Sequence, residues 1–229
     1  MADGKSVHPP RLPEQLEPME APVLEDDALW DGAVVNGVVG VPEGKAELVE
    51  ITGCHLQGAQ LTGCELERLS LVDVMFDDCE LSGALFLEAR LRRVQFNRCR
   101  MSGFVMTRAI AEHVAFTDCK LDAANFRMSS WESALWLRCE LPSADFASAS
   151  LKGGRLLECN LSRVDMSGAR FAGVFLHGSD LTDLKGADSL RGVTIGVDQV
   201  VPLAGPVFSA LGISVADDPD DEADAADGR

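Results

Sequence analysis

The chain lacks the long apolar runs that membrane and secretory segments require. Nowhere in its 229 residues do roughly 18 apolar residues follow one another, the length of a membrane-spanning helix. Residues 1–27 hold five prolines among scattered charges, which excludes the apolar core of a signal peptide. We therefore expect a cytoplasmic protein that has no membrane partner.

Groups for acid–base catalysis are also scarce. The four histidines are His8, in the N-terminal arm, and His55, His113 and His177, which fall on different edges or distant coils of the repeat described below. No Ser-His-Asp arrangement, phosphate-binding loop or pair of buried carboxylates stands out. The sequence therefore predicts that the protein is not an enzyme and carries no cofactor.

What the chain does contain is an unbroken column of apolar residues at every fifth position. From Ile51 to Leu181 all 27 members are apolar, although apolar residues make up only 46% of the composition. The odds of such a run by chance are on the order of 10⁻⁹, and a period of five fits neither a helix nor an alternating strand. The chain must instead turn a corner every five residues.

A second column, of mostly small residues, lies two positions before the first. Residues two apart in an extended segment share one side, so both columns should point inward. If each corner is about a right angle, four pentapeptides close one coil, and Phe76, Phe96, Phe116 and Trp136 recur at that twenty-residue interval. With coils roughly 4.8 Å apart, about seven coils would form a rod whose two ends need caps.

All seven cysteines occupy the small inward column. They are Cys54, Cys64, Cys79, Cys99, Cys119, Cys139 and Cys159. A row of thiols one coil apart cannot surround a metal ion tetrahedrally, and CxxC spacing is absent. A disulfide needs Cβ atoms about 3.8 Å apart, closer than stacked coils place them. We therefore expect free thiols that act as small apolar filler, without a metal, in a reducing compartment.

The repeated unit has a small residue, then Asp or Asn, then Leu or Phe, then two variable positions. Near-ideal copies are residues 124–128 (ANFRM), 144–148 (ADFAS) and 179–183 (SDLTD). Over about residues 49–184 the chain thereby resembles the pentapeptide-repeat family. The resemblance implies an all-β solenoid, specifically a right-handed quadrilateral parallel β-helix, in agreement with the twenty-residue coil. Where the family favours Asp or Asn, this chain has Arg90, Arg100, Val105, Ile110, Leu135, Arg155 and Phe175, which marks a specialised outer surface.

We predict five parts along the chain. They are a flexible Pro-rich acidic arm (1–28), an irregular N-terminal lead-in (29–48), the β-helix (49–186), a short C-terminal helical cap (187–213) and a disordered acidic tail (214–229). In the cap, Asp198 is a candidate N-cap and Gly212 a stop signal. Pro202 and Pro206 predict a kinked helix or two short ones, because an interior proline costs about 3 kcal/mol.

The net charge of −17 is concentrated at the two ends of the chain. Residues 49–213 hold twenty acids and sixteen bases, so the predicted rod is almost balanced. Its basic cluster includes Arg90, Arg92, Arg93, Arg98 and Arg100, which could contact an anionic partner or form a solvated, charge-paired face. Because no aromatic residues are interleaved with the cluster, we expect no direct binding of nucleic acid.

An apolar cluster is predicted on the outside of the later coils. Leu135, Leu137, Leu157 and Phe175 flank one inward column, and an exposed cluster of this kind usually marks a contact surface. Two alternatives remain open: the C-terminal segment covers the cluster, or the cluster is free. A free cluster would most simply serve a homodimer.

Two functions fit these observations. The first is a non-catalytic scaffold that binds an unidentified protein partner. The second is implied by the resemblance, because some family members bind DNA gyrase as DNA mimics and confer quinolone resistance or protect against gyrase poisons. The basic cluster in the middle of the rod weighs against a DNA mimic, because a mimic needs a negative potential. The sequence therefore favours the scaffold.

Overall fold

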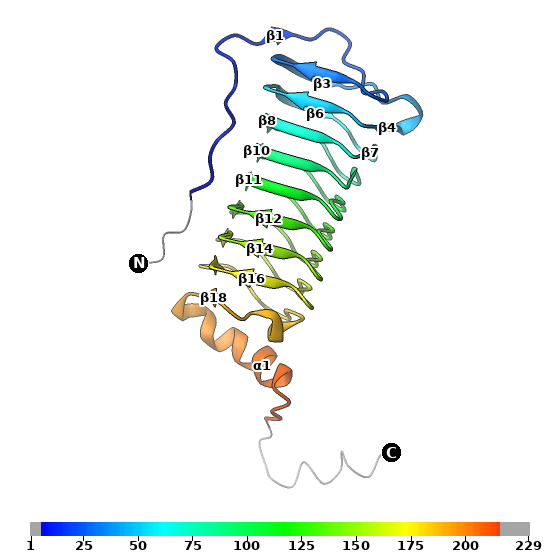
Figure 1. Ribbon diagram of the computed structural model, residues 1–229. Helices are drawn as coiled ribbons and strands as arrows, with labels where there is room; N and C mark the ends of the chain where they lie inside the picture. The colour runs from blue at the N-terminus through cyan, green and yellow to red at the C-terminus, as the bar shows by residue number, and fades with distance from the viewer. Residues whose placement is uncertain (1–5, 216–229) are drawn as a thin grey trace.

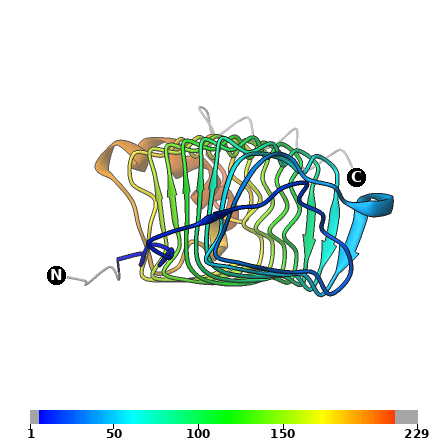
Figure 2. The same cartoon turned by 90° about the horizontal axis from the view of Figure 1, so that it is seen from above.

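The chain winds into a right-handed, four-sided β-solenoid of about nine turns, with one helix at its C-terminal end (Figure 1). This architecture comes from a computed structural model, which describes residues 6–215. Nearly all of the tail predicted over residues 214–229, and the first five residues of the predicted arm, lie outside the described residues. Figure 2 shows the coils stacked behind one another with the helix at the far end.

Two parallel sheets and a series of isolated bridges cover the sides of the solenoid. The fifteen-stranded sheet contains β1 (Glu17–Pro18), β2 (Leu29–Asp31), β3 (Ala33–Val38), β5 (Glu50–Thr52), β6 (His55–Gln60), β8 (Ser70–Asp77), β10 (Arg90–Asn97), β11 (Ile110–Thr117), β12 (Ser130–Glu132), β13 (Leu135–Leu137), β14 (Ser150–Lys152), β15 (Arg155–Leu157), β16 (Arg170–Ala172), β17 (Val174–Phe175) and β18 (Val193–Thr194). The smaller sheet contains β4 (Lys45–Glu47), β7 (Glu65–Glu67) and β9 (Leu85–Leu87). The helical elements are η1 (Pro42–Gly44), η2 (Ala187–Ser189), η3 (Val197–Gln199) and α1 (Val200–Ala210).

The strand register confirms the twenty-residue coil. In β8, β10, β11 and β13, Phe76 pairs with Phe96, Phe96 with Phe116, and Phe116 with Trp136. Their rings stack almost parallel, with centroids 4.7, 4.8 and 5.6 Å apart. The first two values match the spacing of strands paired through their backbones.

The inward columns form the core. All 27 members of the fivefold column are buried, and the most exposed of them, Phe171, keeps only 8% of its surface accessible. Burying a large apolar side chain contributes roughly 1.5–3 kcal/mol, so this column is the main source of stability. The sequence prediction of which residues face inward is confirmed.

Each corner places one residue in the left-handed backbone region. Every fifth residue from Leu48 to Asp183 has a positive φ, between 50° and 68°. Most of these positions carry a side chain, although a non-glycine residue there costs about 1–2 kcal/mol. The cost is offset because the turn directs the next pair of side chains into the core.

The structure has more coils than the seven predicted, because both flanking segments add one. Residues 29–48 form a complete coil instead of an irregular lead-in: β2 and β3 pair with β5 and β6 at an offset of 21 residues, as in Trp30 with Ile51. A register shift between Asn36 and Val38 lengthens this coil further. At the other end, β18 pairs with β17 at an offset of 19 residues. Because these offsets differ from twenty residues, the apolar residues of the two end coils do not all continue the fivefold column in the sequence.

The C-terminal cap contains one α-helix, α1, where the sequence predicted two short helices or a kinked one, and Pro206 lies inside this helix. Pro202 lies in the first turn of α1, where backbone N–H groups have no helical partner to lose. Gln199 precedes the helix, in place of the Asp198 cap that was expected. The helix ends at a left-handed Gly212 (φ +70°), with Ile213 N–H bonded to Phe208 O at 2.8 Å, a Schellman motif.

The N-terminal segment packs against the solenoid, where the sequence predicted a flexible arm. We call residues 6–16 the strap. The strap runs along one edge of the stack (dark blue in Figure 1), and its Pro13 ring lies over Gly53, 3.2 Å from where a Cβ would stand. Further along, the Arg11 N–H donates to Asp73 Oδ1 at 2.9 Å. The strap therefore crosses successive coils at a single corner.

Candidate functional site

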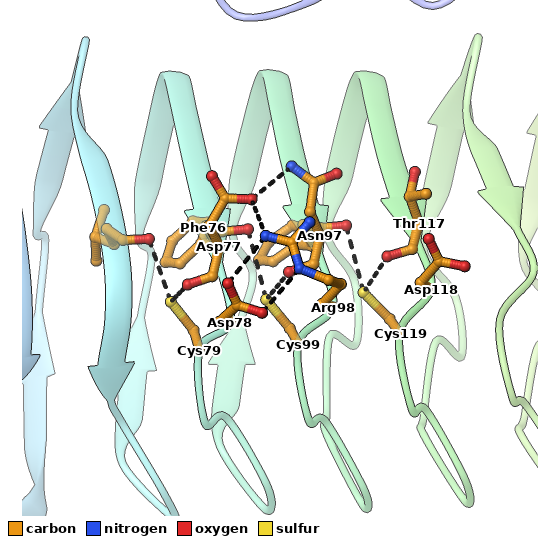
Figure 3. Close-up of polar contacts among 12 residues, drawn as sticks. Phe76, Asp77, Asp78, Cys79, Asn97, Arg98, Cys99, Thr117, Asp118 and Cys119 are labelled. Carbon is orange, nitrogen blue, oxygen red and sulfur yellow. Dashed lines mark hydrogen bonds and ion pairs between the residues drawn. The ribbon is translucent and has the colours of Figure 1, made fainter.

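The interior of the solenoid holds a ladder of thiols. Five cysteines at twenty-residue intervals each donate the S–H to a backbone carbonyl 23 residues earlier, as in Cys99 to Phe76 O (3.6 Å) and Cys119 to Phe96 O (3.3 Å) (Figure 3). Ser179 and Gln199 continue the ladder, with Ser179 Oγ 2.9 Å from Leu156 O. The ladder ends at the buried Gln199, whose amide N–H groups donate to Leu176 O and Ser179 O.

All seven cysteines are free and buried. Burial raises the pKa of Cys64 to about 11 and also raises the pKa of Cys54. Because the thiolate is the reactive form, the raised pKa keeps Cys54 and Cys64 unreactive. Within residues 6–215, no group of three or more histidine, cysteine or acidic side chains is placed to hold a metal ion.

We expect the thiols of the native protein to be inert. A maleimide or aromatic disulfide reagent at mildly alkaline pH should label fewer than one thiol per chain, whereas all seven should react after denaturation. Mass spectrometry of the labelled chain measures this directly. Rapid labelling of any cysteine in the native state would contradict the ladder.

His55, His113 and His177 lie apart, as their sequence positions indicated, whereas His8 contacts His113. His55 Nε2 pairs with Asp77 Oδ2 at 2.7 Å, and Asp77 also accepts a hydrogen bond from Asn97. His113 lies at a corner under the strap, and His177 is exposed in a late coil.

Among the described residues, no helix is long and apolar enough to cross a membrane.

Three of the five predicted partner-surface arginines are paired with acids one coil earlier. Arg93 makes two bonds of 2.5 Å to Asp73. Arg98 makes bonds of 2.8 and 2.9 Å to Asp78 (Figure 3), and Arg100 lies 4.0 Å from Glu80. Arg93 and Arg98 lower the pKa of Asp73 and Asp78, respectively, by hydrogen bonding. The charge of these three arginines is therefore locally neutralised.

The other two arginines are exposed and lie in the strand that also contains Arg93. Arg90 and Arg92 lie in β10, next to Ile110 and Glu112 in register. The five arginines share one coil but are distributed over its sides and corners. The structure consequently does not bring them together as one basic patch.

The four predicted apolar residues do lie together on one side. Leu137 pairs with Leu157, while Leu135 and Phe175 belong to the neighbouring outward column, with Arg155 between them. All four side chains are partly exposed. Helix α1 has its main contacts with η2 and η3 at the end of the solenoid, and β18 of the C-terminal segment pairs with β17, which places Thr194 beside Phe175. We call these four residues the side patch.

A second apolar surface was missed by the sequence analysis. Helix α1 contains no charged residue, its Val201 is 82% exposed, and Leu211, which directly follows the helix, is 68% exposed. Between the helix and the last turn lies an apolar hollow of about 370 Å³, lined by Leu190, Val193, Ile195, Val200, Leu203, Ala204, Val207 and Phe208. The uncharged run over residues 200–211 is the sequence signal that could have indicated this surface.

A solved structure with a TM-score above 0.5 shares the fold. A trypsin-treated variant of QnrB1, a plasmid-mediated fluoroquinolone resistance protein, matches with a TM-score of 0.51 and 22% identity over 86% of this chain and 98% of that one. HetL, a pentapeptide-repeat protein involved in heterocyst differentiation regulation from the cyanobacterium Nostoc sp. strain PCC 7120, matches with a TM-score of 0.35 and 16% identity over 73% and 87%. A comparison with curated proteins gave no match.

Family comparison agrees with the repeat geometry. Residues 49–126 match "Pentapeptide repeat region", and residues 144–183 match "Pentapeptide repeats (8 copies)". Together the two matches cover more than half of the chain, and they lie inside the stacked coils described above. The chain therefore belongs to the pentapeptide-repeat family.

Proposed function

We propose that this protein is a non-catalytic scaffold that binds another protein through its outer surface and pairs with a second copy of itself through α1. The observation that carries the proposal is the filled interior: every inward position of the fivefold column is occupied by a buried side chain. Binding must then use the outside of the rod. Seven unpaired thiols fit a reducing compartment, so we place the protein in the cytoplasm.

The proposed contact between copies rests on the charge and exposure of α1. Two chains that each carry a net charge of −17 repel one another. Repulsion is smallest where charge is absent, and α1 combines the absence of charge with exposed Val201 and Leu211. Removing such side chains from water on both copies stabilises the pair, and a two-fold contact uses the same surface twice.

We predict that changing Val201 and Leu211 together to Glu converts a dimer to a monomer. Two carboxylates per copy would have to be buried in an apolar contact, which is strongly unfavourable. Light scattering coupled to size-exclusion chromatography measures the mass directly. The matched control is Leu137→Glu with Leu157→Glu, which alters the side patch and should leave the dimer intact. A monomeric wild-type chain at micromolar concentration would contradict this part of the proposal.

The side patch is the proposed surface for the protein partner. Leu137 and Leu157 lie side by side in register and are partly exposed, whereas Arg93, Arg98 and Arg100 are already paired with acids. A pull-down that compares the wild type with Leu137→Glu plus Leu157→Glu should lose the partner, while Val201→Glu plus Leu211→Glu should retain it. Equal recovery with both variants would exclude the side patch.

A second candidate is a gyrase-binding DNA mimic. Two observations favour it: the rod has no inserted loops between residues 49 and 183, and residues 1–48 hold ten acids and three bases. Arg90 and Arg92, which are exposed at mid-rod, weigh against it. The test adds the protein to purified gyrase, relaxed plasmid and ATP. Unchanged supercoiling and no rescue from a quinolone at micromolar protein would eliminate this candidate.

A further inference from the structure

The strap ends on a pair of histidines that join distant parts of the chain. The backbone N–H of His8 donates to Nδ1 of His113, 3.3 Å away, across a separation of 105 residues. The two rings meet edge to face, with centroids 4.2 Å apart. The strap is therefore attached to β11 by contacts that require Nδ1 of His113 to be unprotonated.

The same corner carries the other attachment points of the strap. Asp73 accepts the Arg11 N–H and also holds Arg93, so one carboxylate joins the strap to β8 and β10. The side chains of Asp73 and Arg93 are only 12% and 14% exposed in this arrangement. An ion pair is thus shielded at a corner that would otherwise face water.

We propose that the strap is a pH-gated latch, closed over the corner formed by Asp73, Arg93 and His113 when His113 is neutral and released when His113 gains a proton. Protonation places a hydrogen on Nδ1, where it faces the His8 N–H. The hydrogen bond then becomes a repulsive contact between two donors. This inference is independent of the proposed function, since it concerns the chain alone.

The groups around His113 come from the strap and from three strands. Burial is the main cause that lowers the pKa of His113, and His8 and Arg93 lower it further. Glu112, whose Oε1 lies 3.8 Å from Nε2, and Glu132 act in the opposite direction, but the net pKa is lowered.

The direction of the pKa shift sets the pH at which the latch opens. A histidine whose pKa is lower in the closed state favours closure above its ordinary pKa of about 6.5 and progressively loses this effect as the pH falls toward the lowered value. Asp73 stays ionised throughout, because Arg93 holds the pKa of that carboxyl below its usual range. Protonation of His113 therefore removes the His8 contact and leaves the charge of the acceptor of the Arg11 N–H unchanged.

Hydrogen exchange of the full chain tests the latch. Amides of residues 6–16 are compared at about pH 7.5 and about pH 5.5, on either side of the ordinary histidine pKa, after correction for intrinsic rates. We expect protection at Arg11 to fall roughly fivefold at the lower pH, the effect of one lost hydrogen bond. Amides in β13 should keep their protection, which separates opening of the strap from unfolding.

Two variants separate the latch from other effects of pH. His113→Asn suits the left-handed backbone at this corner (φ +55°), supplies an uncharged acceptor and cannot titrate, so the strap should stay closed at both pH values. His177→Asn removes an exposed histidine of a late coil and should keep the wild-type response. Equal protection at both pH values in the wild type, or a persistent pH response in His113→Asn, would overturn the proposal.

Discussion

Replacing Trp136 with Ala should lower the free energy of unfolding by about 3–5 kcal/mol, the usual cost of deleting a large aromatic ring from a core. Trp136 is fully buried, continues the stack of Phe76, Phe96 and Phe116, and contacts Phe146 at a centroid distance of 5.7 Å. Neighbouring coils cannot close the cavity, because their spacing is fixed by backbone pairing. Urea denaturation followed by far-UV circular dichroism measures the loss.

Two controls assign this loss to the cavity. Trp136→Phe should cost about 1 kcal/mol or less: phenylalanine already occupies the column, and the indole N–H has no hydrogen-bond partner among the described residues. Leu137→Ala, at the partly exposed neighbouring position, should also cost less than about 1 kcal/mol. A similar loss in all three variants would contradict the inward direction of Trp136.

Gly186→Ala should destabilise the protein by about 3 kcal/mol. Gly186 has φ +76°, and a Cβ there would stand 2.6 Å from Ser167 Cα and 2.7 Å from Met166 C. These are backbone atoms of the preceding coil, so the coil itself would have to move. Overpacking of this kind costs about 1–3 kcal/mol, and a left-handed alanine costs about 1 kcal/mol more.

Gly173→Ala is the matched control for Gly186→Ala. Gly173 also has a positive φ (+63°), but no described atom lies within 4 Å of its Cβ position. This variant should therefore carry only the backbone cost, about 1 kcal/mol. The difference between the two midpoints in a urea titration reports the close approach of the last coil. Equal midpoints would mean that the left-handed backbone angle alone requires glycine at position 186, and that the close approach to Met166 and Ser167 does not.

The core was predictable because its apolar residues recur at every fifth position. The first coil was not predictable, because its sequence does not keep this period. The column from Ile51 to Leu181 shows its period directly, whereas the coil of β2 and β3 has an offset of 21 residues and a register shift. The strap has no period at all. Its position depends on contacts such as His8 with His113, which no local pattern in a proline-rich segment encodes.

The candidate surfaces were predictable only in part. Because residues twenty apart stack in successive coils, the sequence predicted that the side patch lies on one side of the solenoid. The strand register, which pairs Leu137 with Leu157, agrees with this prediction. The same arithmetic pairs Asp73 with Arg93 and Asp78 with Arg98, which would have shown that the arginines neutralise the preceding coil. The uncharged run over residues 200–211 indicates that α1 is apolar, but it does not tell an exposed helix from a buried one, since an uncharged helix is equally suited to burial.

Acrylamide quenching of tryptophan fluorescence tests the central claim, that side chains of the fivefold column fill a closed interior. The chain has three tryptophans and no tyrosine, and all three tryptophans are buried: Trp30, Trp131 and Trp136. We predict blue-shifted emission that acrylamide barely quenches until the protein is denatured. Efficient quenching of any tryptophan in the native protein would contradict the solenoid core.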